Sequence, residues 1–436
     1  MKTGELFRSL PAAPVAQTPQ AGPVPAATRV ISAVRNQVEM VYRDLDSTLP
    51  PDHPARAIWA LLERLDLSGF YAQIRAVIGA PGRPPTDPRV LLALWVYATV
   101  EGISSARELD ELTERDDAFR WLRGGVPLNY HLLADFRTAH QAALNTLLTE
   151  IITVLLSEQL VSLKRVAQDG MRVRASAGAA SFRRAPTLRR LRREAQQQVE
   201  SLAQASADSA LSQRQRAARA RAAQEQLERV ERALGQLPAV QALKPVDKQE
   251  QARVSTTDAD ARVMKMADGG FRPAYNVQLA TETEHQVIVG VTVTNQGSDM
   301  QEAVPMVGQV EARTGRRPAD YLMDGGFVNK EAVRALAAKE MTVYAPVQQP
   351  KEPTRDPYQP LPGDAPEVAA WRQRMGTAEA KQIYKERAAT AECVNAQCRT
   401  VHGLQQFTVR GLSKVGCVVL LTAIAHNLLR WLALTT

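Results

Sequence analysis

Apolar residues recur every three or four positions through the first third of the chain. This spacing is seen in PARAIWALLERLDL, PRVLLALWVYATVEG, SARELDELTERDDAFRWLRGG and LLADFRTAHQAALNTLLTEIITVLL. It is the period of an amphipathic helix, so we predict an all-helical domain over residues 35–160. The third run starts with acidic residues and ends at Gly124 and Gly125, as helix signals require. Three short helices between Ser104 and His140 are compatible with a helix-turn-helix that binds DNA, and a purely structural packing role explains the pattern equally well.

The period changes to two after residue 160. KRVAQDGMRVRA is predicted to be a strand, and YNVQLAT and QVIVGVTVT are predicted to form a hairpin. Downstream, ADYLMD and MTVYAPV read as strands that alternate with three helical segments. This alternation predicts a mixed α/β sheet flanked by helices.

A segment of different character separates the first strand from the hairpin. TLRRLRREAQQQVESLAQ and RAARARAAQEQLERVERAL both have helical spacing, so a helical hairpin insert is predicted over about residues 183–250. Its first helix is strongly basic. We consider four arginines as candidate phosphate contacts, although a charge run is more often a solvated helix face. They are Arg189, Arg190, Arg192 and Arg193.

The composition narrows the class of protein and its partners. The 436 residues include 54 Lys and Arg against 46 Asp and Glu, a formal charge of +8 that favours a polyanionic partner. The three cysteines do not form the framework of a secreted protein, so a reducing, cytoplasmic location is expected. The apolar run near the C-terminus is interrupted by His426, Asn427 and Arg430, which favours a buried helix and no membrane contact.

Three carboxylates stand where the predicted elements would bring them together. Asp169 lies on the first strand, Asp324 ends a later strand, and Glu392 lies on the last long helix. Clustered carboxylates repel one another unless a cation neutralises them, and hard oxygen ligands suit Mg²⁺. Two such ions would activate a nucleophile and stabilise the leaving oxygen of a phosphodiester, and Mn²⁺ could substitute. Taken singly, an Asp-Gly pair such as Asp169-Gly170 or Asp324-Gly325 is more often a plain turn.

Two cations on the last long helix accompany Glu392. Lys385, Glu392 and Arg399 are spaced seven apart, so they are predicted to share one face and to contact DNA phosphates beside the metal ions. An ordinary charged stripe facing solvent has the same spacing. Asp299 precedes a predicted helix and is interpreted as its N-cap.

The order of strand, hairpin, helix, strand, helix, strand and helix is that of an RNase H-like domain. Within it, the segments AQDGMRVRASAG, STTDADARVMK, DGGF and YKERAATAECVNAQCRTVHGLQQFTVRGLSKV resemble bacterial insertion-sequence DDE transposases. The resemblance extends from about Tyr42 to Leu432. It implies an RNase H-like core with a helical insert, Mg²⁺ dependence and a catalytic triad at Asp169, Asp324 and Glu392.

The resemblance also implies partners, and the composition and pattern of the chain predict a domain plan. The partners would be double-stranded DNA, both the terminal inverted repeats and a target, bound by a homodimer associated with the nucleoid. The expected plan is a disordered lead-in (1–34), a helical DNA-binding domain (35–160), a catalytic domain (161–402) with a Pro-rich loop (346–376), and a helical tail (403–436).

The family signature around the final acid reads Tyr, two residues, Arg, three residues, Glu, six residues, Lys. This chain has Tyr384, Arg387, Glu392 and Arg399, so the gap after Arg387 is one residue longer and arginine replaces lysine. Three functions are compatible with these features. An active transposase that cleaves and joins DNA is preferred because all three acids are present, and an inactive or domesticated relative that binds specific DNA is the alternative. A helical protein-binding scaffold would leave the three acids unexplained.

Overall fold

The computed structural model describes residues 38, 40, 42–72, 74–76, 84–204, 212–350 and 355–435. The chain divides into two compact units, Met1–Arg43 and Asp44–Thr436. All the helices and strands described below belong to the second unit. The lead-in at 1–34, which the sequence predicts to be disordered, lies outside the described residues.

The first part of the second unit is helical, as the apolar spacing predicts. The longer helices are α1 (Pro54–Glu63), α3 (Pro88–Val100), α4 (Ala106–Arg115), α6 (Tyr130–Ala139) and α7 (Gln141–Ser157), and the shorter ones are α2 (Ser68–Tyr71) and α5 (Asp117–Arg123). Helix α3 is central, because ten consecutive residues from Val90 to Thr99 are all buried. Its Trp95 indole donates to the Leu133 carbonyl of α6 at 2.8 Å, which joins the two helices.

Two of the predicted helices are each broken into two by a local polar residue. The third run breaks at Asp116, whose carboxylate accepts from the backbone amides of Ala118 and Phe119 and therefore starts a new helix, α5. The fourth run breaks at His140, where α6 and α7 meet at 68°. Apolar spacing continues across both breaks, so the period alone does not reveal them. Helices α4, α5 and α6 are the three short helices expected between Ser104 and His140.

The second part contains a mixed sheet. Its strands are β1 (Arg165–Arg174), β4 (Arg262–Lys265), β5 (Phe271–Glu282), β6 (Ile288–Thr294), β7 (Asp320–Met323) and β8 (Thr342–Tyr344). Antiparallel β5 pairs with β1 along one edge and with β4 and β6 along the other, while β1, β7 and β8 run parallel. The sheet is therefore mixed α/β, as predicted. Strand β4 was not predicted, because it is short and only one of its four residues, Met264, is buried.

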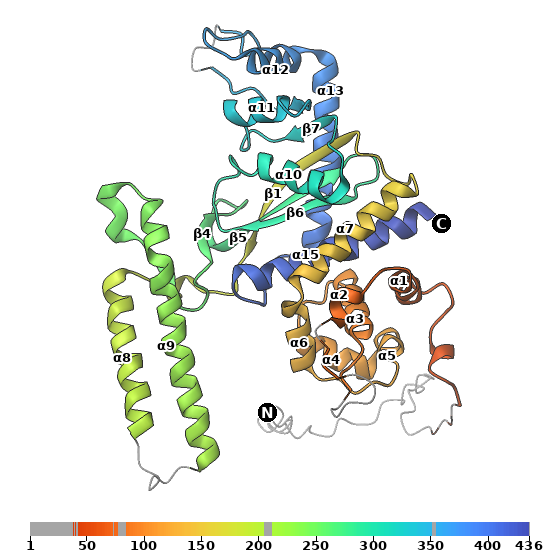
Figure 1. Ribbon diagram of the computed structural model, residues 1–436, viewed down its shortest axis with the longest axis vertical. Helices are drawn as coiled ribbons and strands as arrows, with labels where there is room; N and C mark the ends of the chain where they lie inside the picture. Colours follow the sequence, from red (N-terminus) through yellow and green to blue (C-terminus); the bar gives the residue numbers. More distant parts are fainter. Residues whose placement is uncertain are drawn as a thin grey trace, which may run out of the picture. The chain divides into compact units, whose positions relative to one another are not determined.

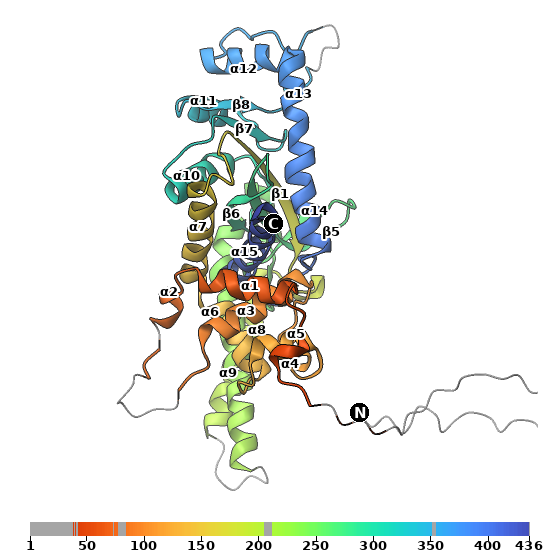
Figure 2. The ribbon, with the colours of Figure 1, turned by 90° about the vertical axis from the view of Figure 1, so that its right-hand side faces the viewer.

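Helices cover both faces of this sheet. Figure 2 shows α10 (Ala303–Thr314) on one side and the rod of α13 (Ala378–Arg387) and α14 (Cys393–Thr400) on the other. Burial on both faces explains why β5 is buried continuously from Pro273 to Glu282 instead of in alternation. Helix α11 (Lys330–Ala337) connects β7 to β8.

Helix α15 (Leu412–Thr435) joins the helical part to the sheet. It packs against α3, α6, α7 and β6. Asn427 accepts from the Ile288 amide of β6 at 2.9 Å and donates to the Ile288 carbonyl at 2.8 Å. By length and apolarity α15 could cross a membrane, but 67% of its apolar window is buried inside the protein. It is thus the buried helix that the polar interruptions predict.

The insert is a helical hairpin, α8 (Ala185–Gln204) and α9 (Gln213–Ala242), which projects away from the sheet in Figure 1. The stretch between its helices falls outside the described residues. A small separate core holds its base together, formed by Leu188, Ala233, Leu237, Val240, Ala252 and Val254. The short strands β2 (Phe182–Arg183) and β3 (Val254–Ser255) pair at this base. Farther along the chain, the end of the segment 346–376 is helical and not a loop, because Pro366 begins α12 (Pro366–Gly376).

Candidate active site

The register of two parallel strands places Asp169 beside Asp324. The pairing of β1 with β7 ends at Gln168 opposite Met323, and the next residues on both strands are the two acids. Neighbouring strands lie about 4.8 Å apart, so the carboxylates start from adjacent backbone positions. Asp169 is 16% exposed, and its Oδ1 accepts from the Gly170 amide at 2.9 Å.

Glu392 approaches from the long helix through an irregular turn. Residues Ala388–Glu392 form a π-helical turn between α13 and α14, in which backbone hydrogen bonds span five residues instead of the four of an α-helix. This turn absorbs the longer gap between Arg387 and Glu392 that distinguishes the chain from the family signature. The Arg387 guanidinium donates to Glu392 Oε1 at 2.5 Å and lies 3.6 Å from Asp169 Oδ2.

The electrostatics at Asp169 reflect burial and crowding of like charge. Burial raises the pKa of Asp169 to about 6; the Arg387 guanidinium opposes this, and the Asp324 and Glu392 carboxylates add to it. The three predicted acids therefore interact, and Arg387 is the cation that offsets their charge. Arg387 also lies over the Tyr384 ring, 5.8 Å from its centroid.

Two polar atoms beside Asp169 are buried without a hydrogen-bond partner among the described residues. They are Arg387 Nη1 and Asn395 Oδ1. Asn395 donates through Nδ2 to Asp169 Oδ2 at 3.1 Å, so its free oxygen belongs to the same cluster. Sequence reasoning missed Asn395, although it lies three residues after Glu392 and so on the same side of α14. The oxygen donors fit a hard cation such as Mg²⁺, and the orphaned amide oxygen is a site for water or a ligand.

Asp299 is not the helix N-cap that the sequence suggested. Helix α10 begins after Glu302, and Asp299 is held instead by the side chains of β1 and β5. Its carboxylate accepts from Asn276 Nδ2 at 2.7 Å and Gln278 Nε2 at 2.6 Å, and it pairs with Arg172 at 2.8 Å. A short polar side chain with several donors in reach is satisfied by tertiary contacts in preference to a local cap.

The glycines beside the acids differ in how much space they leave. The space next to Gly170 is filled by side chains and is not left open for metal or DNA. A Cβ at Gly170 would lie 2.5 Å from Gln278 Nε2 and 2.7 Å from Asp299 Oδ1. A Cβ at Gly326 would lie 3.1 Å from Asp324 Oδ1, whereas one at Gly325 would make only ordinary contact with Pro346 at 3.5 Å.

The two predicted phosphate-binding cations of the long helix differ in their environment. Lys385 is exposed, and Arg399 is partly buried, with a long hydrogen bond of 3.4 Å to the Arg172 carbonyl. The π-helical turn lies between Lys385 and Glu392, and one extra residue rotates the downstream helix by about 100°. Lys385 therefore does not share the face of Glu392 and Arg399, which the regular spacing had predicted.

The arginines of the insert lie far from the acids. Arg189, Arg190, Arg192 and Arg193 are exposed on α8, and Arg190 pairs with Glu194 at 2.6 Å. Figures 1 and 2 show α8 and β7 at opposite ends of the second unit. This basic cluster therefore does not adjoin the acidic cluster, and its contact with DNA phosphates stays a prediction. The hairpin is inserted after β1 has already passed the site, and it departs from the other end of the strand.

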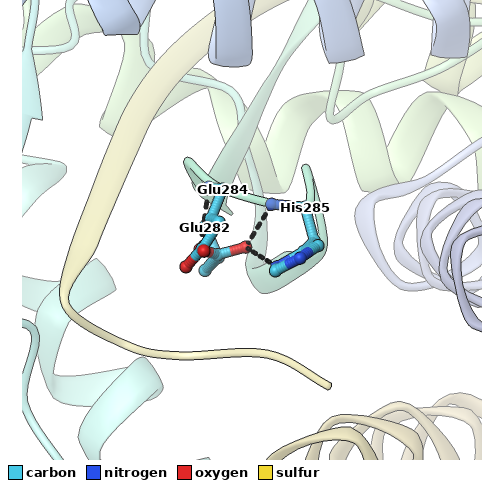
Figure 3. Close-up of side chains that lie close together, drawn as sticks. All are labelled: Glu282, Glu284 and His285. Carbon is cyan, nitrogen blue, oxygen red and sulfur yellow. Dashed lines mark hydrogen bonds and ion pairs between the residues drawn. The ribbon is translucent and has the colours of Figure 1, made fainter. Parts of the chain in front are cut away.

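A different acidic group has the more compact geometry. Within the described ranges, one set of three ligand-type side chains has all its ligand atoms within 4.8 Å, namely Glu282, Glu284 and His285 in the turn between β5 and β6 (Figure 3). Glu282 is buried and accepts from the backbone amides of Glu284 and His285, both at 2.8 Å. These hydrogen bonds stabilise the turn, and both carboxylate oxygens of Glu282 already accept a hydrogen bond from it.

Comparison with known proteins identifies two parts of the chain. Residues 43–139 match the family model of a transposase domain (DUF772), and residues 365–432 match that of a transposase DDE domain. The second match includes Glu392, but it begins at residue 365 and so does not include Asp169 or Asp324. No curated protein and no solved structure is significantly similar to the chain. The first match covers the helical part up to α6, and the second covers the long helix with the π-helical turn and most of α15. Both are matches to transposase domains, and together they support an insertion-sequence DDE transposase.

Proposed function

We propose that the protein cleaves phosphodiester bonds at the terminal inverted repeats of a DNA element and joins the liberated 3′-hydroxyls to target DNA. The observation that carries this proposal is that Asp169 and Asp324 come directly after the paired part of β1 and β7, with Glu392 and Arg387 brought in from the helix. The strand order β6, β5, β1, β7, β8, with β5 antiparallel, supports an RNase H-like core.

Each residue of the cluster has a definable part in the proposed chemistry. Asp169, Asp324 and Glu392 would hold Mg²⁺, or Mn²⁺ in its place, and the metal would supply charge stabilisation and a more acidic water or hydroxyl. Asn395 fixes one oxygen of Asp169, which leaves the other side of the carboxylate oriented by the Gly170 amide. Arg387 holds Glu392 toward Asp169 and offsets the negative charge.

The proposed partners follow from the family and from the charge. They are double-stranded DNA at the repeats and the target, bound by a homodimer in the cytoplasm. The basic face of α8 and Arg399 are proposed DNA contacts, and Lys385 is proposed only as a peripheral one. The second candidate function is a domesticated relative that binds the same DNA without cutting it.

Nicking of inverted-repeat DNA tests the proposal. Wild-type protein is incubated with end-labelled duplex carrying one element end, with Mg²⁺ or with EDTA. Asp169→Asn, Asp324→Asn and Glu392→Gln should each abolish nicking while duplex binding stays within about twofold. Asp268→Asn is the matched control, because this exposed carboxylate contacts its own turn, pairing with Arg272 and accepting from the Gly270 amide. Nicking that survives any of the three changes removes that residue from the site, and binding without any nicking by the wild type favours the second candidate.

A further inference from the structure

A cavity at the base of the insert is lined by cations from two separate elements. Its volume is about 640 Å³, and it lies between α9, the loop 256–260 and the start of α15. Arg229 and Arg232 reach it from α9, Lys414 from the start of α15, and Arg410 from the segment just before that helix. Within the described ranges none of the four forms an ion pair, although the cavity also contains two acids.

The two acids of this cavity are committed to other groups. Asp258 accepts from the Tyr275 hydroxyl at 2.7 Å and the Gly411 amide at 3.2 Å, and Asp260 accepts from the Leu412 amide at 3.0 Å. They therefore cap the first amides of α15, so the helix terminus itself is not open to an anion. Four cations without an ion pair among the described residues face two carboxylates, which leaves the cavity with an excess of positive charge; Arg410 also donates from Nε to the Ser176 carbonyl at 3.2 Å.

One polar atom of the cavity is without a partner. Asp258 is 2% exposed, and its Oδ2 has no hydrogen bond within the described part of the chain. An orphaned buried oxygen costs stability unless water or a ligand satisfies it. Burial raises the pKa of Asp258, while hydrogen bonds from Tyr275 and the Gly411 amide lower it.

The cavity wall is fixed in place. Arg262 Nη2 of β4 donates to Gln236 Oε1 of α9 at 2.9 Å, and the hairpin core around Leu237 closes the base. The spacing of the cations therefore does not depend on the far end of the hairpin. A fixed array of cations is suited to a ligand with repeated negative charge.

The residues that line the cavity indicate which class of ligand it can bind. It includes the hydroxyls of Thr256 and Thr257 and the backbone at Gly235 and Gly411, and it contains no aromatic ring. Proteins bind unpaired bases by stacking them on aromatic side chains, whereas cations, hydroxyls and small residues contact phosphates. The lining therefore favours the backbone of a duplex over a single strand or a nucleotide base.

We propose that this cavity binds the phosphodiester backbone of duplex DNA, through Arg229 and Arg232 on one side and Arg410 and Lys414 on the other. The inference rests on the proposed function, because it says where the DNA lies outside the acidic cluster. The site would hold the duplex by its phosphates without reading sequence, and free phosphate is the other ligand with the same chemistry.

Salt-dependent binding of the full-length chain tests this. The probe is a fluorescein-labelled 30-bp duplex of random sequence, followed by anisotropy at several NaCl concentrations. The variants are Arg229→Gln/Arg232→Gln and Arg410→Gln/Lys414→Gln. Each phosphate contact contributes about 0.9 to the slope of log K against log salt, so each pair should lower the slope by about 1.8 and weaken binding at least tenfold near 0.1 M salt.

A matched control removes the same charge elsewhere. Arg316 and Arg334 are exposed, lie near α10 and on α11, and have no ion pair within the described residues. Arg316→Gln/Arg334→Gln should change the slope by less than about 0.5. If the cavity variants change the salt slope no more than this control does, and their melting temperatures are unchanged, the inference is overturned. If one double variant melts at a lower temperature, the salt slope of the other double variant decides.

Two further arms separate related explanations. Sodium phosphate at constant ionic strength should not displace the duplex at millimolar concentration; displacement that the pocket variants abolish would assign the cavity to free phosphate and overturn the DNA proposal. Nicking is scored in parallel. If the wild type does not nick DNA but the cavity variants lower the salt slope, the proposed function fails and the cavity remains a DNA site. If the wild type nicks DNA but the cavity variants leave the salt slope unchanged, the proposed function stands and the cavity is not a DNA site.

Discussion

The protonation of Asp169 should make the free energy of unfolding depend on pH in a way that Asp169→Asn removes. Burial raises the pKa of this carboxyl to about 6 in the folded protein, against an ordinary value of 3.8. The unfolded chain therefore releases the proton at lower pH than the folded protein does. Stability due to this group is present in acid and is lost as pH rises through 6.

The size of the effect follows from these two values. The full shift is worth about 3 kcal/mol, since one pKa unit is about 1.4 kcal/mol. Between pH 5 and pH 8, Asp169 changes from mostly protonated to ionised in the folded protein, while it is ionised in the unfolded chain throughout. The wild type should therefore lose about 1.4 kcal/mol more than the variant over this range.

Urea unfolding in EDTA at pH 5 and pH 8, followed by tryptophan fluorescence, measures the difference. Comparing each protein with itself cancels any effect of the amide that does not depend on pH. Asp268→Asn is the control, and its pH dependence should match that of the wild type apart from the loss of one exposed ion pair. A wild type and an Asp169→Asn variant with parallel pH profiles would show that the carboxylate is neither buried nor crowded in solution, and the electrostatic account of the cluster would fail.

Three further changes test the contacts that position the site. Gly170→Ala should lower stability by about 1–3 kcal/mol in thermal unfolding, because its new Cβ would lie 2.5 Å from Gln278 Nε2; an unchanged melting temperature would contradict the packing described. Asn427→Ala should cost about 2–4 kcal/mol, since it leaves the Ile288 amide and carbonyl of β6 without partners, and a loss below 1 kcal/mol would mean that the link between α15 and the sheet is made elsewhere. Asp116→Ala should cost about 1 kcal/mol by removing the cap of α5, and equal melting of variant and wild type would argue against this cap.

The main elements could be predicted from periodicity because burial and secondary structure have the same period. The strands and the hairpin of the sheet, the insert and the buried last helix all follow from apolar spacing. The helix break at Asp116 could not be predicted in this way, because the apolar residues keep their spacing across it. Strand β4 was missed for a different reason: it has only four residues, and its two apolar ones, Val263 and Met264, are adjacent, so the segment shows no alternation.

The acids of the candidate site were accessible from sequence, whereas the groups around them were not. Asp169 and Asp324 each follow a buried strand segment, and that position is visible in the chain. The partners of Asp299 come from two strands: β5, more than twenty residues earlier in the chain, and β1, more than a hundred residues earlier. The register of β1 with β5 brings Arg172 opposite Asn276, and so gathers these partners around Asp299. A local rule such as helix capping therefore chose the wrong partner for Asp299.

The π-helical turn explains how a departure from the family signature can be accommodated at the site. With one more residue between Arg387 and Glu392, a regular α-helix would rotate Glu392 by about 100° away from the direction that the signature spacing gives it. The turn at Ala388–Glu392 takes up this residue, and Arg387 still contacts both Glu392 and Asp169. π-helical turns are rare and occur mostly as single turns inside α-helices, and this one keeps Arg387 in contact with Glu392. Regular helix geometry is therefore given up at the one turn where it would separate the third acid from the other two.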